Sequence, residues 1–337
     1  MTISDAELRK TAKQFFLQTP ADLSQGYVKW AEDLQAYKGL DYGCVLDNHL
    51  IPLHPGDLMA VVARPGHGKS SWMAYMAKRA ADDIIRREVD NEVVVYVTWE
   101  QTAEEVEAFF QSAGDYSVTD MAWGKADINL IKRKSLARAG IPIWIFGESK
   151  RHEGRKRPRM TIEYVYASIE SMFEDYGVKP ILMCLDYVQI MPINWGDDKT
   201  ARVDEAIRQA KDLAIRMGLP VIIGVQAARR VDNYTNQIPV MSDAQWSSAI
   251  EQVADKQLAL WRPIRNKHPD EHPSIQVGQE NYANDEDLFV IRLLKQRFGI
   301  GHGVWAVRFK PDTLDIYDYT KQEIEYSSNG GYAELDF

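Results

Sequence analysis

The stretch that decides the fold is Ala63-Arg-Pro-Gly-His-Gly-Lys-Ser70, which lies between an apolar run and a helical pattern. The run Leu58–Val62 predicts a short buried strand, and apolar residues recur at helical spacing from Trp72 to Ile84. A strand that passes through a glycine-bearing turn into a helix directs backbone N–H groups and the positive end of the helix toward an anion. The stretch therefore predicts a site for the phosphates of ATP or a close relative.

Within this stretch, Lys69 is placed to reach the β- and γ-phosphates, and the Ser70 hydroxyl is placed to ligate Mg²⁺. The strict form of the motif has glycine at position 63, where this chain has alanine. The strand and helix on either side disfavour the alternative, which is a chance Gly-Lys-Ser at the start of a helix. The residues predicted to hold the nucleotide are Arg64, Pro65, Gly66, His67, Gly68, Lys69, Ser70 and Ser71.

The composition is that of an ordinary globular protein, with 45% hydrophobic and 26% charged residues among 337. No apolar run approaches the ~20 residues that span a bilayer, and the polar N-terminus is not a secretory signal. The two cysteines, Cys44 and Cys184, give neither a disulfide framework nor a metal cluster, so we expect a reducing, cytoplasmic setting and no membrane partner. A net charge of −9 argues against a surface that coats nucleic acid, although it leaves room for a local basic site.

The middle of the chain alternates strand-like and helix-like segments, which favours an α/β fold with a mostly parallel twisted sheet flanked by helices. Strands are expected at 58–63, 93–98, 141–146, 181–185, 220–225, 257–261, 288–294 and 303–309. Helices are expected at 69–87, 102–113, 128–138, 161–176, 201–217 and 247–253. The predicted division is a helical N-terminal arm over 1–37, one ATPase domain over 38–319 and a polar tail over 320–337.

Three further strands end in polar side chains at the expected ligand edge. Asp186 follows the apolar run Ile181–Leu185, and a carboxylate beyond such a buried strand is placed to hold Mg²⁺. Its alternative role is a turn residue or helix cap, which the nearby phosphate loop disfavours. Glu100 is either a base that polarises the attacking water or a first-turn glutamate favoured by a helix dipole. Gln226 is placed to hydrogen-bond the γ-phosphate or that water.

Five blocks occur in order: Ala63-Arg-Pro-x-x-Gly-Lys-Ser70, Leu185-Asp-Tyr-Val-Gln189, Leu219-Pro-Val-Ile-Ile-x-x-Gln226, Ile250-Glu-Gln-x-Ala-Asp255 and Lys295-Gln-Arg297. Together they resemble the C-terminal motor domain of DnaB-type replicative helicases, in superfamily 4 of the RecA-like P-loop ATPases. The resemblance covers roughly residues 38–318. That family forms rings, usually hexamers, in which ATP lies between neighbouring subunits.

The resemblance implies a role for each matching residue. Lys69 and Ser70 would hold phosphate and Mg²⁺, Glu100 would activate water, Asp186 would complete the metal site and Gln226 would sense the γ-phosphate. Lys295 and Arg297 would reach into the neighbouring subunit's site, with Arg297 as the arginine finger. Without the resemblance, these two cations on one face of a strand are equally compatible with a solvated hairpin near Gly299.

Two departures from the family pattern bear on function. The helicases carry a separate N-terminal collar domain, whereas this chain has a short helical arm that resembles the segment packing against the next subunit. Before Ile250, the family usually has Arg-Glu-Ser-Gly on a loop that touches the DNA backbone, but this chain reads Gln245-Trp-Ser-Ser248. Gln245 removes a phosphate partner. Trp246 would stack on a base, or serve as a buried anchor or a contact for a partner protein.

A basic run, Lys150–Arg159, lies between the expected strand ending near Phe146 and the helix beginning near Thr161. Arg155, Lys156 and Arg157 are predicted to contact nucleic-acid phosphates, and the alternative is a solvated loop. Beyond Gln226, Arg229 and Arg230 either add to a basic lining or pair with carboxylates such as Asp232 and Asp243.

The leading hypothesis is a ring-forming ATPase that hydrolyses ATP between subunits, with ATP and Mg²⁺ as cofactors, to translocate on or unwind single-stranded nucleic acid. The expected partners are further copies in a hexameric ring, single-stranded DNA and a loading or recruiting protein. The alternative is a helicase-derived ATP-dependent switch that assembles and recruits partners with little unwinding. A RecA-type recombinase shares the ATP site, but the last two blocks count against it.

Overall fold

The computed structural model describes residues 4–112, 116–193, 198–234, 236–244, 249–266, 272–299 and 301–328. The chain divides into two units, Met1–Leu40 and Asp41–Phe337. The first unit contains α1 (Asp5–Phe15) and α2 (Pro20–Ala36), which begin with capping boxes on Ser4 and Thr19. Both helices lie inside the arm predicted over residues 1–37, and neither buries a residue.

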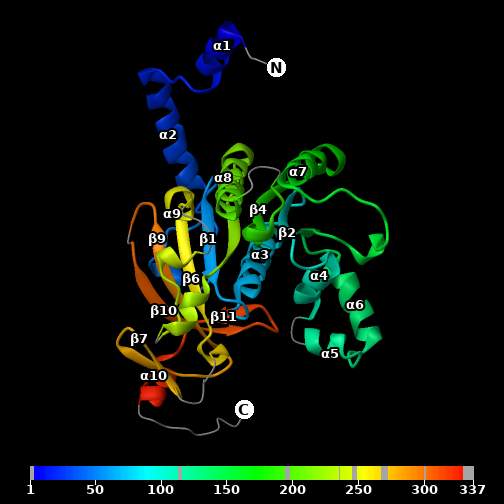
Figure 1. Cartoon of the computed structure of the whole chain (residues 1–337), viewed down its shortest axis with the longest axis vertical. Coiled ribbons are helices and arrows are strands. Elements are labelled where there is room, and N and C mark those ends of the chain that lie inside the picture. The colour runs from blue at the N-terminus through cyan, green and yellow to red at the C-terminus, as the bar shows by residue number, and fades with distance from the viewer. Residues whose placement is uncertain are drawn as a thin grey trace. The chain divides into compact units, whose positions relative to one another are not determined.

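The second unit is built on a nine-stranded sheet, counted over the described residues, in the order β11-β10-β9-β6-β1-β5-β4-β2-β3 (Figure 1). The strands from β6 to β3 in this order run parallel, and β9, β10 and β11 extend the sheet in antiparallel fashion. The bounds are β1 (Leu58–Ala63), β2 (Glu92–Thr98), β3 (Ile143–Phe146), β4 (Lys179–Asp186), β5 (Val221–Gln226), β6 (Lys256–Trp261), β9 (Leu288–Gln296), β10 (Gly303–Lys310) and β11 (Asp315–Tyr317). A separate hairpin is formed by β7 (Ser274–Val277) and β8 (Glu280–Ala283).

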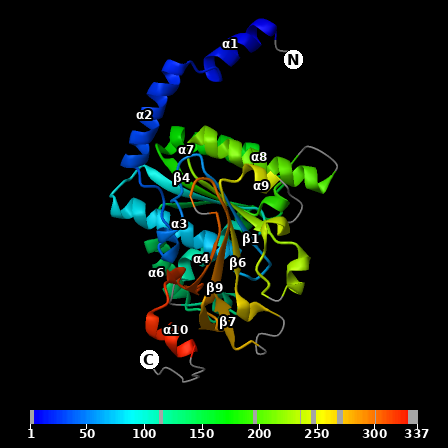
Figure 2. The same ribbon diagram turned by 90° about the vertical axis from the view of Figure 1, so that its left-hand side faces the viewer.

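Helices cover both faces of the central strands. In Figure 2, α7 and α8 lie on one side of the strands, and α3 and α4 lie on the other. Both faces need cover because successive side chains along a strand point to opposite faces of the sheet. On one face, Leu58, Ala60 and Val62 of β1 pack with residues of α7 and α8 in one apolar cluster. The helices are α3 (Lys69–Arg86), α4 (Ala103–Ser112), α5 (Val118–Ala122), α6 (Ile128–Arg138), α7 (Ile162–Tyr176), α8 (Lys199–Met217), α9 (Ala249–Val253) and α10 (Lys321–Ser328).

The predicted mostly parallel sheet with flanking helices is confirmed, and each strand expected from the sequence overlaps a strand of the structure. The sequence missed β7, β8, β11 and α5, which are short. The tail predicted from residue 320 begins with α10, where Ile324 packs beside the apolar cluster that includes Trp261. Among the described helices, none has the length and apolar character needed to cross a bilayer.

Candidate nucleotide site

The phosphate loop connects β1 to α3. Gly68 has φ = 85°, in the left-handed region that favours glycine, and a Cβ there would lie 2.8 Å from the ring of Phe289. α3 begins immediately after it, at Lys69. The N–H groups of its first turn lack partners within the helix and carry the positive end of the helix dipole. The sequence thus builds an anion site where β1 ends.

Lys69 and Asp186 meet beyond the ends of β1 and β4. The Lys69 ammonium forms an ion pair with Asp186 Oδ1 and lies 4.5 Å from the centroid of the Tyr187 ring. Glycine at position 224 leaves space for this pair, because a Cβ there would lie 3.0 Å from Lys69 Nζ and 3.1 Å from Asp186 Oδ1. The Lys69 ammonium and the Asp186 carboxylate, which were predicted from separate motifs, therefore lie in contact at one site.

The second oxygen of Asp186 has its own partner, which the sequence analysis missed. The hydroxyl of Tyr96, in the middle of β2, donates to Asp186 Oδ2 at 2.9 Å, and both side chains are buried. Because a buried hydroxyl needs a partner, the Tyr in the otherwise apolar run Val93–Val97 was the available signal. With Tyr96 on one oxygen and Lys69 on the other, the rotation of the carboxylate is fixed.

The donor set fits Mg²⁺ held together with a nucleotide. The described residues contain no group of three or more His, Cys, Asp or Glu that would hold a metal alone. Mg²⁺ in phosphoryl-transfer sites is usually bound by one or two carboxylates together with the phosphates of the substrate. Asp186 and the hydroxyl of Ser70, the second residue of α3, match that requirement.

Tyr96→Phe is expected to raise the Mg²⁺ concentration needed for half-maximal binding of a fluorescent ATP analogue by about tenfold, the lower end of the effect of outer-shell partners. The reason is that Asp186 Oδ2 loses its donor and the carboxylate rotates. Tyr75→Phe is the matched control, because the buried Tyr75 hydroxyl donates instead to the carbonyl of Tyr42 at 2.7 Å. An equal shift in both variants would contradict the role given to Tyr96.

Glu100 and Gln226 lie at the same edge of the sheet. The pKa of Glu100 is raised above its usual range by partial burial and by the negative charge of Asp186, while Lys69 opposes the shift. A raised pKa makes the carboxylate a better proton acceptor near neutral pH. Gln226 pairs in register with Ala63, and its N–H and carbonyl bond the Gln189 side chain at 3.1 and 3.2 Å.

Two residues predicted to hold nucleotide turn their side chains into the protein. Arg64 donates to both carboxylate oxygens of Asp232, at 2.7 and 2.9 Å. His67 Nδ1 accepts the N–H of Arg262 at 3.2 Å, and burial, aided by the charge of Arg64, lowers the pKa of His67 to about 4. The imidazole is therefore neutral near pH 7. Both side chains hold the phosphate loop in place through contacts with other parts of the protein.

Lys295 and Arg297 lie at the opposite edge of the sheet from the phosphate loop. Gln296, between them, pairs with Lys256 at the start of β6, whereas Ala63 pairs with Leu260 near its end. The six residues of β6 span ~17 Å at the usual rise per residue. The structure therefore brings Lys69, Asp186, Glu100 and Gln226 together and separates Lys295 and Arg297 from them.

The two cations at that edge contact the end of α9. Lys295 Nζ donates to the carbonyl of Glu251 at 2.7 Å, and Arg297 Nη2 donates to that of Gln252 at 3.3 Å. Arg297 Nη1 also lies 3.0 Å from Asp255 Oδ1. Burial and the neighbouring Arg297 lower the pKa of Lys295 below its usual value. Both side chains thus lie on one face and are held in place.

The cations predicted to contact nucleic acid differ in their surroundings. Arg155 and Lys156 are exposed beyond β3, whereas Arg157 pairs with Glu148 at 2.5 Å. Arg230 pairs with the buried carboxylate of Asp243 at 2.5 Å, which is the alternative role considered for it. Arg229 is exposed, and Gln245 and Trp246 lie outside the described residues.

A basic hollow that the sequence did not predict lies beside the segment that follows Asp186. It has a volume of about 350 Å³ and is lined by Arg159, Lys199 and Arg202 over an apolar floor that includes Val188 and Met191. The cations come from the end of the basic run and from the first turns of α8. Only the fold brings these segments together, so no local pattern could have indicated the hollow.

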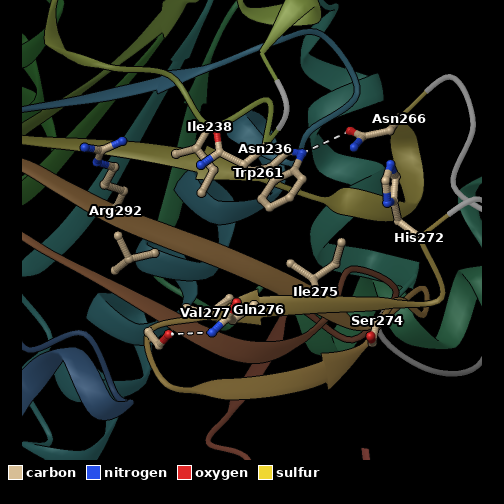
Figure 3. A pocket seen from close by; sticks show the side chains of 12 residues that line it. Asn236, Ile238, Trp261, Asn266, His272, Ser274, Ile275, Gln276, Val277 and Arg292 are labelled. Atoms are coloured by element: carbon tan, nitrogen blue, oxygen red, sulfur yellow. Dashed lines mark hydrogen bonds between the residues drawn. The ribbon is translucent and has the colours of Figure 1, made fainter. Parts of the chain in front are cut away.

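A different hollow, of about 340 Å³, lies between the β7–β8 hairpin and the strands β6 and β9 (Figure 3). Its lining includes Arg292 and also Trp261, whose indole N–H donates to Asn266 Oδ1 at 3.0 Å. None of the residues that converge on Lys69 lines it. It is therefore separate from the nucleotide site.

Comparison with known sequences identifies the family of the chain. The family model for the DnaB-like helicase C-terminal domain matches residues 39–316. The replicative DNA helicase DnaB of Mycoplasma pneumoniae is 26% identical over 268 residues, covering 77% of this chain and 52% of the relative. That of Pasteurella multocida is 26% identical over 255 residues, covering 75% and 50%. The chain thus spans about half the length of these curated relatives.

Solved structures share the fold. One of them, described as an ATPase domain, superposes with a TM-score of 0.71 at 18% identity, covering 90% of this chain and all of that domain. A DnaB-like replicative helicase, solved in a study of its interactions with primase, gives a TM-score of 0.69 at 18% identity, covering 94% of this chain and 71% of that one.

Proposed function

Because this chain belongs to the family of DnaB-like helicase C-terminal domains, we propose that it hydrolyses ATP between neighbouring copies in a ring and thereby moves along or unwinds single-stranded DNA. One observation carries the proposal. Lys69, Asp186, Glu100 and Gln226 converge at one edge of the sheet, and Arg297 lies at the opposite edge. In this proposal Arg297 therefore acts on a nucleotide bound by another copy.

Each group has a distinct part in this reaction. Lys69 binds the β- and γ-phosphates once they displace its contact with Asp186. Glu100 orients the attacking water and accepts its proton, and the Gln226 amide contacts the γ-phosphate. Mg²⁺, held by Ser70 and Asp186, would neutralise phosphate charge. Arg297 of the next copy stabilises the charge that develops on the transferred phosphoryl group.

The arm supports assembly into a ring. α1 and α2 expose large apolar side chains, among them Phe15, Leu23 and Trp30, which are 62%, 58% and 53% exposed. Apolar stripes of this kind mark interaction surfaces. We assign the surface to a contact with the next copy, with six copies as the expected number.

The nucleic-acid contact is assigned to cations at the ligand edge. Arg155 and Lys156 are exposed there, and Arg159, Lys199 and Arg202 line the basic hollow after Asp186. The hollow couples this contact to catalysis, because Gln189, also in its lining, bonds the backbone of Gln226.

Replacing Arg155 and Lys156 together by Gln is expected to weaken binding of single-stranded DNA and to flatten its salt dependence. For two lost phosphate contacts, the slope of log K against log [salt] should fall by about 1.4. The measurement is fluorescence anisotropy over a salt series. Lys132→Gln with Arg133→Gln, two exposed cations on α6, is the matched control. Unchanged DNA binding by the Arg155 and Lys156 variant would contradict this assignment and favour the alternative, in which the loop is only solvated.

Steady-state ATP hydrolysis with and without a single-stranded oligonucleotide tests the proposed function. Stimulation by DNA, together with strand displacement on a forked substrate, is the expected result. A rate of ATP hydrolysis that neither DNA nor RNA changes would favour the alternative, an ATP-dependent switch that recruits protein partners. Absence of hydrolysis in nucleotide-bound oligomers would contradict the proposed function.

A further inference from the structure

Phe298 is an exposed aromatic residue in an unfavourable backbone conformation. Its side chain is 81% exposed, and its φ is 60°. The left-handed region is costly for bulky residues that are not glycine, asparagine or aspartate. Leu314 also has a positive φ, of 53°, but its side chain is 1% exposed, so core packing offsets the cost. Within the described residues, Phe298 has no such compensation.

The backbone around Phe298 is held firmly. The N–H of Arg297 donates to the carbonyl of Asp255 at 2.8 Å, and the Gln296 side chain accepts the N–H of Ile51 at 2.8 Å. A Cβ on Gly299 would lie 3.0 Å from Gln296 Nε2. The ring of Phe298 therefore projects from a firmly held backbone beside Arg297, so this segment loses little conformational freedom when it enters a contact.

We propose that Phe298 anchors the contact between copies of this chain by packing on the rim of the neighbouring copy's nucleotide site. The inference rests on the proposed function, because it places Phe298 one residue from a cation that acts in the next copy. Two half-buried aromatic residues lie beside that site and offer apolar surface: the backbone N–H of Trp99 donates to the carbonyl of Asp186 at 2.9 Å, and the Tyr187 ring centroid lies 4.5 Å from Lys69 Nζ. Aromatic residues are frequent anchors of protein contacts. Burial in a second copy supplies the compensation that the isolated chain lacks.

The test measures assembly and monomer stability separately. In Phe298→Asn, the new residue tolerates the left-handed conformation and lacks the ring. We expect the dissociation constant between copies, from sedimentation velocity with Mg²⁺ and a non-hydrolysable ATP analogue, to rise at least tenfold. The melting temperature of the dilute, monomeric chain should stay the same or rise. Phe298→Tyr, which keeps the ring, should assemble like the wild type.

Phe173→Asn is the matched control, because it removes another exposed phenylalanine, 64% exposed on α7, and should leave assembly unchanged. Hydrolysis by Phe298→Asn should recover as protein concentration rises, because Arg297 is intact. Equal assembly of Phe298→Asn and the wild type would overturn the inference alone. So would a drop of several degrees in the melting temperature of the monomer, since the ring would then support its own fold. A wild-type chain that stays monomeric with nucleotide would overturn the proposed function itself.

Discussion

Arg297→Ala is expected to leave ATP binding intact and to slow hydrolysis by at least ~10³-fold, the lower end of the effect of an arginine finger. Binding survives because Arg297 lies at the edge of the sheet opposite to Lys69. The fold survives because Asp255 keeps two other donors, the N–H of Leu58 at 2.8 Å and Lys211 Nζ at 2.6 Å. Equilibrium binding of a fluorescent ATP analogue and steady-state turnover measure the two quantities separately.

A mixing experiment shows whether Arg297 acts in a neighbour. Glu100→Gln should bind ATP and fail to hydrolyse it, as Arg297→Ala does. In an equal mixture, an interface is complete where an Arg297→Ala copy supplies Glu100 and a Glu100→Gln copy supplies Arg297. Random assembly makes about a quarter of the interfaces complete, so partial activity should return. Mixed oligomers that remain inactive would argue against a shared site.

Lys69→Ala is expected to weaken ATP binding by at least ~100-fold and to abolish turnover. A charge-assisted hydrogen bond contributes about 1.5–3 kcal/mol, and Lys69 is placed to make more than one to the phosphates. The variant also leaves Asp186, which is 1% exposed, with Tyr96 but without its cation. We therefore expect the free energy of unfolding to fall as well, toward the ~3 kcal/mol typical of a broken buried pair.

Lys78→Ala is the matched control for Lys69→Ala. Lys78 lies on the same helix, and its partner is Asp315 at 3.0 Å, with both side chains about one-third exposed. Such surface pairs contribute about 0–1 kcal/mol, so neither ATP binding nor stability should change much. Isothermal titration with ATP and urea unfolding of both variants make the comparison. Normal turnover by Lys69→Ala would contradict the assignment of this loop as the site that binds the phosphates of ATP.

Much of the nucleotide site could be predicted from the sequence. Lys69, Asp186, Glu100 and Gln226 each follow an apolar strand-like run, and parallel strands bring their carboxyl ends to one edge. The side-chain partners could not be predicted in this way. Nothing local distinguishes Arg64, which pairs with Asp232, or Arg230, which pairs with Asp243, from cations that face a ligand. The contacts that Tyr96 and Gln189 make were missed because their partners are distant in the sequence.

The sequence by itself determined the phosphate loop, the alternation of strands and helices and the carboxylate that ends β4. These features depend on residues near one another in the chain, whose spacing selects the local conformation. Only the tertiary structure decided where Lys295 and Arg297 lie. Their strand, β9, runs antiparallel to β6, which carries them to the edge away from the phosphate loop. Strand direction and pairing depend on contacts between distant segments, and local periodicity carries no information about them.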